Sequence, residues 1–527
     1  MKKYINFLLH AHLPFVRETE KEPPLEERWL FEAISETYLP LMRVFRRLDA
    51  DGIPFKINVS VSPTLGTMLQ DELTQERYIA HLNKMLELSE REMIRTTVNP
   101  QMNALVKMYQ DLYQKNLDDF VHRYHKNLLR GLDYFYKKGK IGVIACPATH
   151  PYLPLLEEYP DAVNAQVRMA MQYHSDTFGK TSRGFWLPEC GYYPGIERIL
   201  KENGVKYTFA EAHSLLFAEP RPRYGTYAPI SLKNGLSLFG RDLVSANAVW
   251  SSEEGYPGDF SYREFYRDIG FDLPLDYIGP YVHEGGHRSF TGFKYYAVTG
   301  STDQKRIYQP AEAARKVVEH AENFIYNQRK RLEKVAALMD ISPVISCYYD
   351  AELFGHWWFE GPAWIEAVVR KITETKELEM VLAGEYCKSA ENLQTTDPVF
   401  GSWGNKGYSE VWLDGRNDWV YRHTHKAVER MHELILRFPN ETGLKERALN
   451  QAAREVLLSQ ASDWPFIMRA GTTVSYAVRR VKEHIYNFTT IYDALFRGTV
   501  SPEWLTRLER KNNIFPNIDY RIFNTHS

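Results

Sequence analysis

Two carboxylic acids stand out because each follows a short apolar run and has aromatic neighbours. Glu189 follows the sequence GFWLP, and Asp350 follows the sequence VISCYY. Such surroundings favour carboxylates in a pocket, with a salt-bridged turn as the alternative for Glu189. Glycoside chemistry needs one carboxylate as nucleophile or base and another as acid. The pair therefore predicts a reaction at a glycosidic bond.

Three histidines also follow apolar runs. His10 and His12 are two residues apart on a segment that we expect to be extended, so their side chains share one face. His150 lies in the sequence ATHP, after another apolar run. The three side chains either bind a metal ion, line one pocket or serve as hydrogen-bonded structural histidines.

Aromatic residues accompany further polar ones towards the C-terminus. His356 and Trp357 follow Asp350 closely, and we expect both to bind substrate. Trp403 and Trp412 lie in a segment rich in Trp and Gly, which is typical of a sugar-binding rim or of a protein contact.

An Asp-Trp-Pro sequence interrupts a helical pattern near residue 463. Asp463 either points into the cleft or caps a helix.

The elements that would position these residues alternate between short apolar runs and long amphipathic segments. The expected strands are 5–9, 55–61, 141–145, 184–187, 207–210 and 344–349, and the clearest expected helix is 310–335. Strands that alternate with helices predict a parallel sheet, either a barrel or doubly wound, with the active site at the carboxyl ends of the strands.

Two regions depart from this alternation. Residues 211–300 are rich in Gly, Pro and aromatic residues and predict an inserted subdomain or long loops. From residue 386 onwards the pattern is helical, with helices expected over 444–457, 425–438, 473–496 and 502–511.

Composition excludes several classes of protein. The net charge of −2, from 65 Lys+Arg and 67 Asp+Glu, argues against a nucleic-acid partner. The sequence contains no apolar run of about 18 residues, so it predicts no membrane span. Residues 5–9 are too short for the apolar core of a signal peptide, so we expect a cytoplasmic protein. Cys146, Cys190, Cys347 and Cys387 form no disulfide pattern and are expected to be free thiols.

Five segments, in order, resemble the motifs of glycoside hydrolase family 57. They are HAHLPF, ATHPYLP, WLPECGYYPG, YYDAELFGHWW and SDWPF, and they extend from residue 8 to about 468. The segment WGNKGYSEVWLDGRNDW and the helical C-terminus resemble the 1,4-α-glucan branching enzymes of that family more than its amylopullulanases or 4-α-glucanotransferases.

The resemblance implies an α/β fold built on an incomplete (β/α)7 barrel. The barrel domain would cover 1–385 with an insertion at 211–300, and an all-helical domain would cover 386–527. Glu189 would be the nucleophile and Asp350 the general acid/base of a retaining mechanism. The remaining matched residues would line the cleft: His10, His12, His150, Trp186, Trp357, Trp403, Trp412 and Asp463. No metal or cofactor is implied.

The implied reaction forms α-1,6 branches on an α-1,4-glucan. Glu189 would attack an internal α-1,4 linkage, and Asp350 would serve first as acid and then as base towards an acceptor 6-hydroxyl. We expect the carboxylate of Glu189 to raise the pKa of Asp350. The family's acceptor loop carries a Tyr at its tip, for which Tyr224 is our first candidate and Tyr227 our second.

Three other functions stay open at this stage. An α-amylase or 4-α-glucanotransferase would use the same two carboxylates. A metal-dependent polysaccharide deacetylase would use the histidines as ligands, and a glucan-binding protein without activity would use only the aromatic residues.

Overall fold

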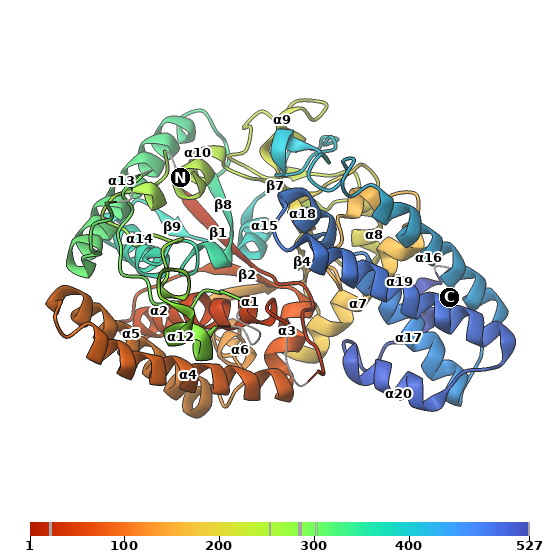
Figure 1. Ribbon diagram of the computed structural model, residues 1–527. Helices are drawn as coiled ribbons and strands as arrows, with labels where there is room; N and C mark the ends of the chain where they lie inside the picture. Colours follow the sequence, from red (N-terminus) through yellow and green to blue (C-terminus); the bar gives the residue numbers. More distant parts are fainter. Residues whose placement is uncertain (21–23, 252–253, 283–286, 301, 303, 525–527) are drawn as a thin grey trace.

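The computed structural model describes residues 1–527 except 21–23, 252–253, 283–286, 301, 303 and 525–527, and parallel strands form its centre (Figure 1). One sheet has the order β3-β2-β1-β8, with β9 also paired to β1. Its strands are β1 (Tyr4–Ala11), β2 (Ile57–Val61), β3 (Ile141–Ile144), β8 (Val344–Asp350) and β9 (Glu379–Met380). Since all its pairings are parallel, the carboxyl ends of its strands lie along one edge.

A second sheet continues the first. It has the order β4-β5-β7-β6, and only the pairing of β6 with β7 is antiparallel. Its strands are β4 (Gly184–Phe185), β5 (Tyr207–Ala210), β6 (Ile230–Ser231) and β7 (Ser237–Gly240). A parallel bridge between Ala145 and Phe185 joins β3 to β4. After β7, the Asp242 N–H donates to the Ser346 carbonyl of β8 at 2.9 Å.

All six expected strands are present, but β7 was not expected. It lies within residues 211–300, as β6 does, so this region contributes two strands to the second sheet and is not wholly an insertion. The strand has only four residues, Ser237–Gly240, and glycines lie at 235 and 240. A segment of so few residues between turn-forming residues is too short to show the alternation of apolar and polar residues that predicts a strand.

Helices cover both sides of the sheets (Figure 1). Before residue 400 they are α1 (Glu27–Glu32), α2 (Leu39–Ala50), α3 (Pro63–Gln70), α4 (Glu72–Arg95), α5 (Pro100–Asp118), α6 (Leu129–Lys137), α7 (Pro160–Phe178), α8 (Ile196–Glu202), α9 (Ala212–Leu216), α10 (Leu243–Trp250), α11 (Ile269–Asp272), α12 (Leu275–Ile278), α13 (Pro310–Ala336), α14 (Gly361–Thr375) and α15 (Ala383–Ser389). The expected helix over 310–335 is α13, which buries Val317, Ala321 and Phe324.

The C-terminal helices gather at one end of the molecule, shown in blue in Figure 1. They are α16 (Trp419–Arg437), α17 (Gly443–Ser459), α18 (Asp463–Ala470), α19 (Val474–Arg497) and α20 (Pro502–Lys511). Helical structure thus becomes dominant at Trp419 and not at 386. Arg480 of α19 donates to Glu18 Oε1 at 2.6 Å, and both side chains are buried. This pair fixes the C-terminal helices against the segment that follows β1.

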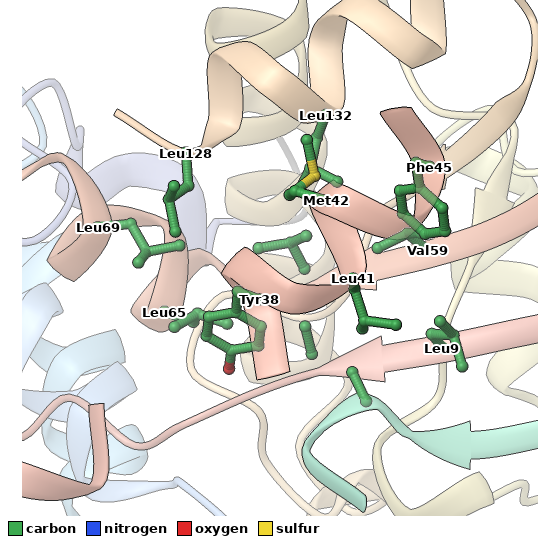
Figure 2. A pocket seen from close by; sticks show the side chains of 13 residues that line it. Leu9, Tyr38, Leu41, Met42, Phe45, Val59, Leu65, Leu69, Leu128 and Leu132 are labelled. Carbon is green, nitrogen blue, oxygen red and sulfur yellow. The ribbon is translucent and has the colours of Figure 1, made fainter. Parts of the chain in front are cut away.

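The first strand separates a polar face from an apolar one. Leu9 and Ala11 line an apolar cavity of about 50 Å³ on the side of α2, α3 and α6 (Figure 2). His10 and His12 alternate with them and therefore point the other way. The expectation that these histidines share one face is confirmed.

Two further expectations from the sequence are met. The structure contains four free cysteines, of which Cys146, Cys190 and Cys347 are buried and Cys387 is partly exposed. None of the helices in the described part of the chain has the length and apolar character needed to cross a membrane.

Candidate active site

A cleft of about 780 Å³ lies at the carboxyl ends of the strands. It brings together nine of the side chains singled out from the sequence: His10, His12, His150, Glu189, Asp350, Trp357, Trp403, Trp412 and Asp463. The further lining residues are Leu13, Glu211, His213, Arg241, Leu243, Asn247, Trp250, Glu352, Ser402, Gly404, Asn405, Lys406, Gly407, Val411 and Phe466. Residues more than 400 positions apart in the chain thus form one site.

Glu189 lies just after β4 and has a left-handed backbone, with φ 62° and ψ 20°. A non-glycine residue in this region is strained, and such strain gathers at functional sites. The carboxylate accepts two hydrogen bonds, from Trp403 Nε1–H to Oε2 at 2.7 Å and from the Ser462 hydroxyl to Oε1 at 3.0 Å. Burial raises the pKa of Glu189, while the bonds from Trp403 and Ser462 oppose this shift.

Asp350 is the last residue of β8 and has different surroundings. Burial raises its pKa well above the usual value, and repulsion from Glu352 and then Glu189 adds to the shift. Arg241 acts in the opposite direction. Glu189 therefore raises the pKa of Asp350 as expected, but its effect is smaller than the effects of burial and of Glu352. The site holds one carboxylate that is supplied with two donors and one carboxyl group whose pKa is raised well above its usual value.

Two of the histidines that line the cleft form a hydrogen-bonded pair. Nε2 of His10 and Nε2 of His150 are 2.9 Å apart, Nδ1 of His10 is 3.2 Å from the Ser60 hydroxyl, and Nδ1 of His150 is 2.9 Å from the Ser462 hydroxyl. Burial lowers the pKa of both imidazoles well below the usual value, so both are neutral near neutral pH.

The third histidine connects β1 to the C-terminal helices. His12 Nε2–H donates to the Asp463 carboxylate at 3.0 Å, and its Nδ1 is 2.8 Å from the Ser62 hydroxyl. Asp463 is the first residue of α18 and lines the cleft. The sequence left open whether Asp463 is a helix cap or a cleft residue, and the structure places it at the cleft.

Among the residues that the structure describes, two groups of side chains have donor atoms close enough to hold a metal ion. They are His10, Cys146 and His150, and His12, His150 and Asp463, each with its atoms within 4.8 Å of one another. All six ring nitrogens of these three histidines have hydrogen-bond partners within the protein. The hydrogen bonds account for this geometry, and we assign these histidines no ligand role.

Aromatic rings form parts of the cleft walls. Trp412 stacks on Tyr152 with ring centroids 4.2 Å apart, and Trp357 stacks on Phe265 at 4.4 Å. Trp357 is half exposed, whereas Trp412 is almost fully buried. The half-exposed ring of Trp357 offers a flat apolar surface, to which sugar rings are complementary.

Three of the expected substrate-binding residues do not line the cleft. Trp186 is fully buried beneath it and stacks on His10 at 4.9 Å. His356 turns towards buried carboxylates and donates from Nδ1 to Glu36 at 2.7 Å. Both side chains support the floor or wall of the site without facing its cavity.

The third is Tyr224, the first candidate for the tip of an acceptor loop. Its hydroxyl donates to Asp340 at 2.8 Å, ahead of β8, whereas Asp350 ends that strand. At about 3.3 Å per residue the two ends of β8 are about 20 Å apart. Tyr227 accepts a bond from Val344 N–H at the start of β8 and also lies away from the cleft. Hydrogen bonds to the start of β8 thus hold this segment outside the site.

Several residues of the site were not predicted from the sequence, although some of them carried a signal. Glu352 lies two residues after Asp350, and Ser462 precedes Asp463 within the same motif. Glu211 follows β5 directly, as a strand-end residue should. Arg241 follows β7 and could not be placed without that strand; it donates to Glu211 and to the Tyr348 carbonyl. Phe466 lies in the same motif as Ser462, whereas Trp250 offered no comparable signal.

Comparisons with known proteins agree with the order of the motifs. The model of glycosyl hydrolase family 57 matches residues 6–398, and a model described as 1,4-alpha-glucan branching enzyme, C-terminal, matches residues 423–523. A 1,4-alpha-glucan branching enzyme of Thermococcus kodakarensis is 31% identical over 98% of this chain and 78% of its own length.

Several solved structures resemble the whole chain, including the following two. The α-amylase AmyC from Thermotoga maritima has a TM-score of 0.93 and 41% identity and covers 99% of both chains. The branching enzyme from Pyrococcus horikoshii has a TM-score of 0.90 and 30% identity and covers 100% of this chain and 98% of its own. With three quarters of the chain matched by the family model and relatives similar over nearly all of it, this protein belongs to glycoside hydrolase family 57.

Proposed function

We propose that this protein is a 1,4-α-glucan branching enzyme that works by a retaining mechanism. Glu189 is the nucleophile in this proposal, because its carboxylate is supplied with two donors and faces the cleft. Asp350 is the general acid/base, because burial and the neighbouring carboxylates raise its pKa and keep a proton on it. His10, His12, His150, Trp357, Trp403, Trp412 and Asp463 are proposed to hold or shape the donor glucan.

The proposed reaction has two steps. Glu189 forms a bond to the anomeric carbon of an α-1,4-linked glucose, while the bond to the leaving glucan oxygen breaks and Asp350 gives that oxygen its proton. The 6-hydroxyl of an acceptor glucan then loses its proton to Asp350 and attacks the same carbon, and Glu189 leaves as a carboxylate. Attack by water at the second step would give hydrolysis.

We propose branching and not hydrolysis because residues 423–523 match the model of the branching-enzyme C-terminal region. This region is part of the site and not an appendage, since Asp463 and Phe466 line the cleft and Ser462 bonds to Glu189. A glucan acceptor would therefore meet a wall of the kind that branching enzymes have.

Hydrolysis, as in an α-amylase, is the second candidate. The placement of Tyr224 and Tyr227 favours it, because neither candidate for an acceptor-holding tyrosine reaches the cleft. The structural relative with 41% identity is described as an α-amylase. A cleft that holds an acceptor poorly would let water compete at the second step.

We further propose that the strands β1, β2, β3, β4, β5, β7 and β8 form an incomplete (β/α)7 barrel. Support comes from the bridge between Ala145 and Phe185 and from the bond between Asp242 and Ser346. We propose a barrel domain over 1–385 and a helical domain over 386–527, the latter supported by α16 to α20. A cytoplasmic location is also proposed, in keeping with the four free thiols.

Incubation with amylose tests the function directly. We would follow iodine absorbance, reducing ends and α-1,6 anomeric protons by NMR in the same reaction. Branching predicts falling iodine absorbance with new α-1,6 signals and few reducing ends. Falling absorbance with rising reducing ends and no α-1,6 signal would replace branching with hydrolysis.

A further inference from the structure

Ser462 occupies the N-cap position of α18 but does not cap the helix. Serine is favoured at N-caps because its oxygen accepts a bond from a free backbone N–H of the first turn. The Ser462 side chain makes no such bond, although Ser501 at the start of α20 does. The Ser462 hydroxyl is buried and lies 3.0 Å from Glu189 Oε1 and 2.9 Å from His150 Nδ1. The serine therefore has a task other than capping.

The direction of each hydrogen bond follows from the charge on Glu189. A carboxylate only accepts, so the single hydroxyl hydrogen of Ser462 goes to Glu189. Ser462 must then accept from His150 Nδ1–H. A neutral imidazole has one N–H, which leaves His150 Nε2 as an acceptor.

The same reasoning continues to the strand β2. His10 Nε2–H must donate to His150 Nε2 over 2.9 Å, and His10 Nδ1 then accepts from the Ser60 hydroxyl at 3.2 Å. The donors thus run from Ser60 through His10, His150 and Ser462 to Glu189. Every ring nitrogen of His10 and His150 is used within this chain of bonds.

We propose that Ser462 is a positioning residue for Glu189, and that it joins the nucleophile to a one-way chain of hydrogen bonds through His150 and His10. This inference rests on the proposed role of Glu189 as nucleophile. It places part of the nucleophile's support in the helical C-terminal region, because Ser462 precedes α18. It also assigns His10 and His150 to the support of Glu189, since neither has a ring nitrogen left for a sugar hydroxyl.

The chemistry of such a residue is the stabilisation of negative charge. A donor to a carboxylate favours its charged form, which is present before attack and again when Glu189 leaves the sugar. The other charged or titratable groups that interact with Glu189 are Asp463, His12, Asp350, Tyr152, Cys146 and Cys190. None of these changes when only the Ser462 hydroxyl is removed.

Ser462→Ala in the full-length enzyme is the test, with kcat, KM and the pH profile measured on amylose. We expect kcat to fall roughly 10- to 100-fold with KM nearly unchanged, since one bond to a charged group is lost. The acid limb of the profile should move to higher pH, because loss of this donor raises the pKa of Glu189. Ser462→Thr keeps a hydroxyl and should recover much of the activity.

Ser501→Ala is the matched control, because its hydroxyl does cap a helix of the same region. It should lower the melting temperature and leave kcat unchanged, whereas Ser462→Ala should lower kcat and move the acid limb whatever happens to the melting temperature. A Ser462→Ala enzyme with wild-type kcat, or with reduced kcat and an unmoved acid limb, would overturn the inference.

The failure of the proposed function would look different. In that case the wild-type enzyme itself would not act on amylose. ¹⁵N NMR of the imidazoles then tests the chain of hydrogen bonds independently of activity. We expect His150 to be protonated at Nδ1 in the wild type and to lose this preference in Ser462→Ala. Protonation of His150 at Nε2 in the wild type would overturn the inference.

Discussion

The surroundings of Glu189 and Asp350 differ in both charge and origin. Glu189 receives two neutral donors, Trp403 and Ser462, which come from distant parts of the chain. Asp350 faces the carboxyl group of Glu352, only two residues further along. Two carboxyl groups of similar intrinsic acidity can therefore be assigned opposite tasks by what lies beside them.

The comparison also shows how each environment is built. The acidic surroundings of Asp350 are local, since β8 and the turn after it supply both carboxyl groups. The donors to Glu189 exist only when residues 403 and 462 have packed against the strand end. A nucleophile that depends on distant donors should be more sensitive to changes outside its own motif.

The largest expected effect comes from removing either carboxyl group. Glu189→Gln and Asp350→Asn should each lower activity by about 10³-fold or more, because one loses the nucleophile and the other the acid. Azide added to Glu189→Gly should give a glycosyl azide of inverted configuration, and azide added to Asp350→Gly a retained one, as polarimetry or NMR can show. The same configuration from both variants would contradict the assigned roles.

Loss of the indole donor should be the next largest effect. Trp403→Phe keeps an aromatic ring but removes the bond to Glu189 Oε2, so kcat should fall roughly tenfold. Without this donor the pKa of Glu189 rises, and the acid limb of kcat/KM against pH should move to higher pH.

Trp412→Phe is a suitable control for that experiment. Its indole nitrogen is buried and has no hydrogen-bond partner in the described structure. Its acid limb should coincide with that of the wild type whatever happens to KM. A shift as large as that of Trp403→Phe would mean that the indole bond is not the cause.

A smaller and opposite effect is expected on the other side of the cleft. Glu352→Gln removes the repulsion that raises the pKa of Asp350, so Asp350 loses its proton at lower pH. The alkaline limb should therefore move to lower pH, with kcat at the optimum changed by roughly threefold or less. An alkaline limb that does not move would contradict the claim that Glu352 raises the pKa of Asp350.

The smallest expected effect lies outside both environments. Tyr224→Phe removes a hydroxyl that bonds to Asp340, which precedes β8. Activity and the ratio of transfer to hydrolysis should stay within about twofold of the wild type, as for other surface substitutions. Parallel NMR and reducing-end measurements on amylose would check this. A marked loss of transfer would return Tyr224 to the acceptor site.

Local patterns in the sequence predicted much of the fold and part of the site. Alternation along β1 was enough to place His10 and His12 opposite Leu9 and Ala11. Apolar runs that end in a charged residue were enough to place Glu189 and Asp350 at strand ends. These predictions succeeded because each depends on residues that are neighbours in the chain.

Other features could not be read in this way. The strand β7 was too short to show a pattern, and without it Arg241 had no expected place. Tyr224 lay in a segment whose path depends on bonds to Asp340 and Val344, more than 100 residues away. Sequence position alone favoured the cleft for Tyr224, and packing placed it elsewhere.

By itself, therefore, the sequence determined which residues could carry glycoside chemistry, the strand ends on which they lie and the family to which the order of the motifs belongs. Only the tertiary structure decided that Trp403 and Ser462 donate to Glu189. It also decided that Glu352 is the charged group with the largest effect on the pKa of Asp350. Finally, it placed Trp186 and His356 behind the residues that line the cleft. The reason is physical: periodicity and turn chemistry act over a few residues, whereas burial, donor direction and charge repulsion depend on which distant segments pack together.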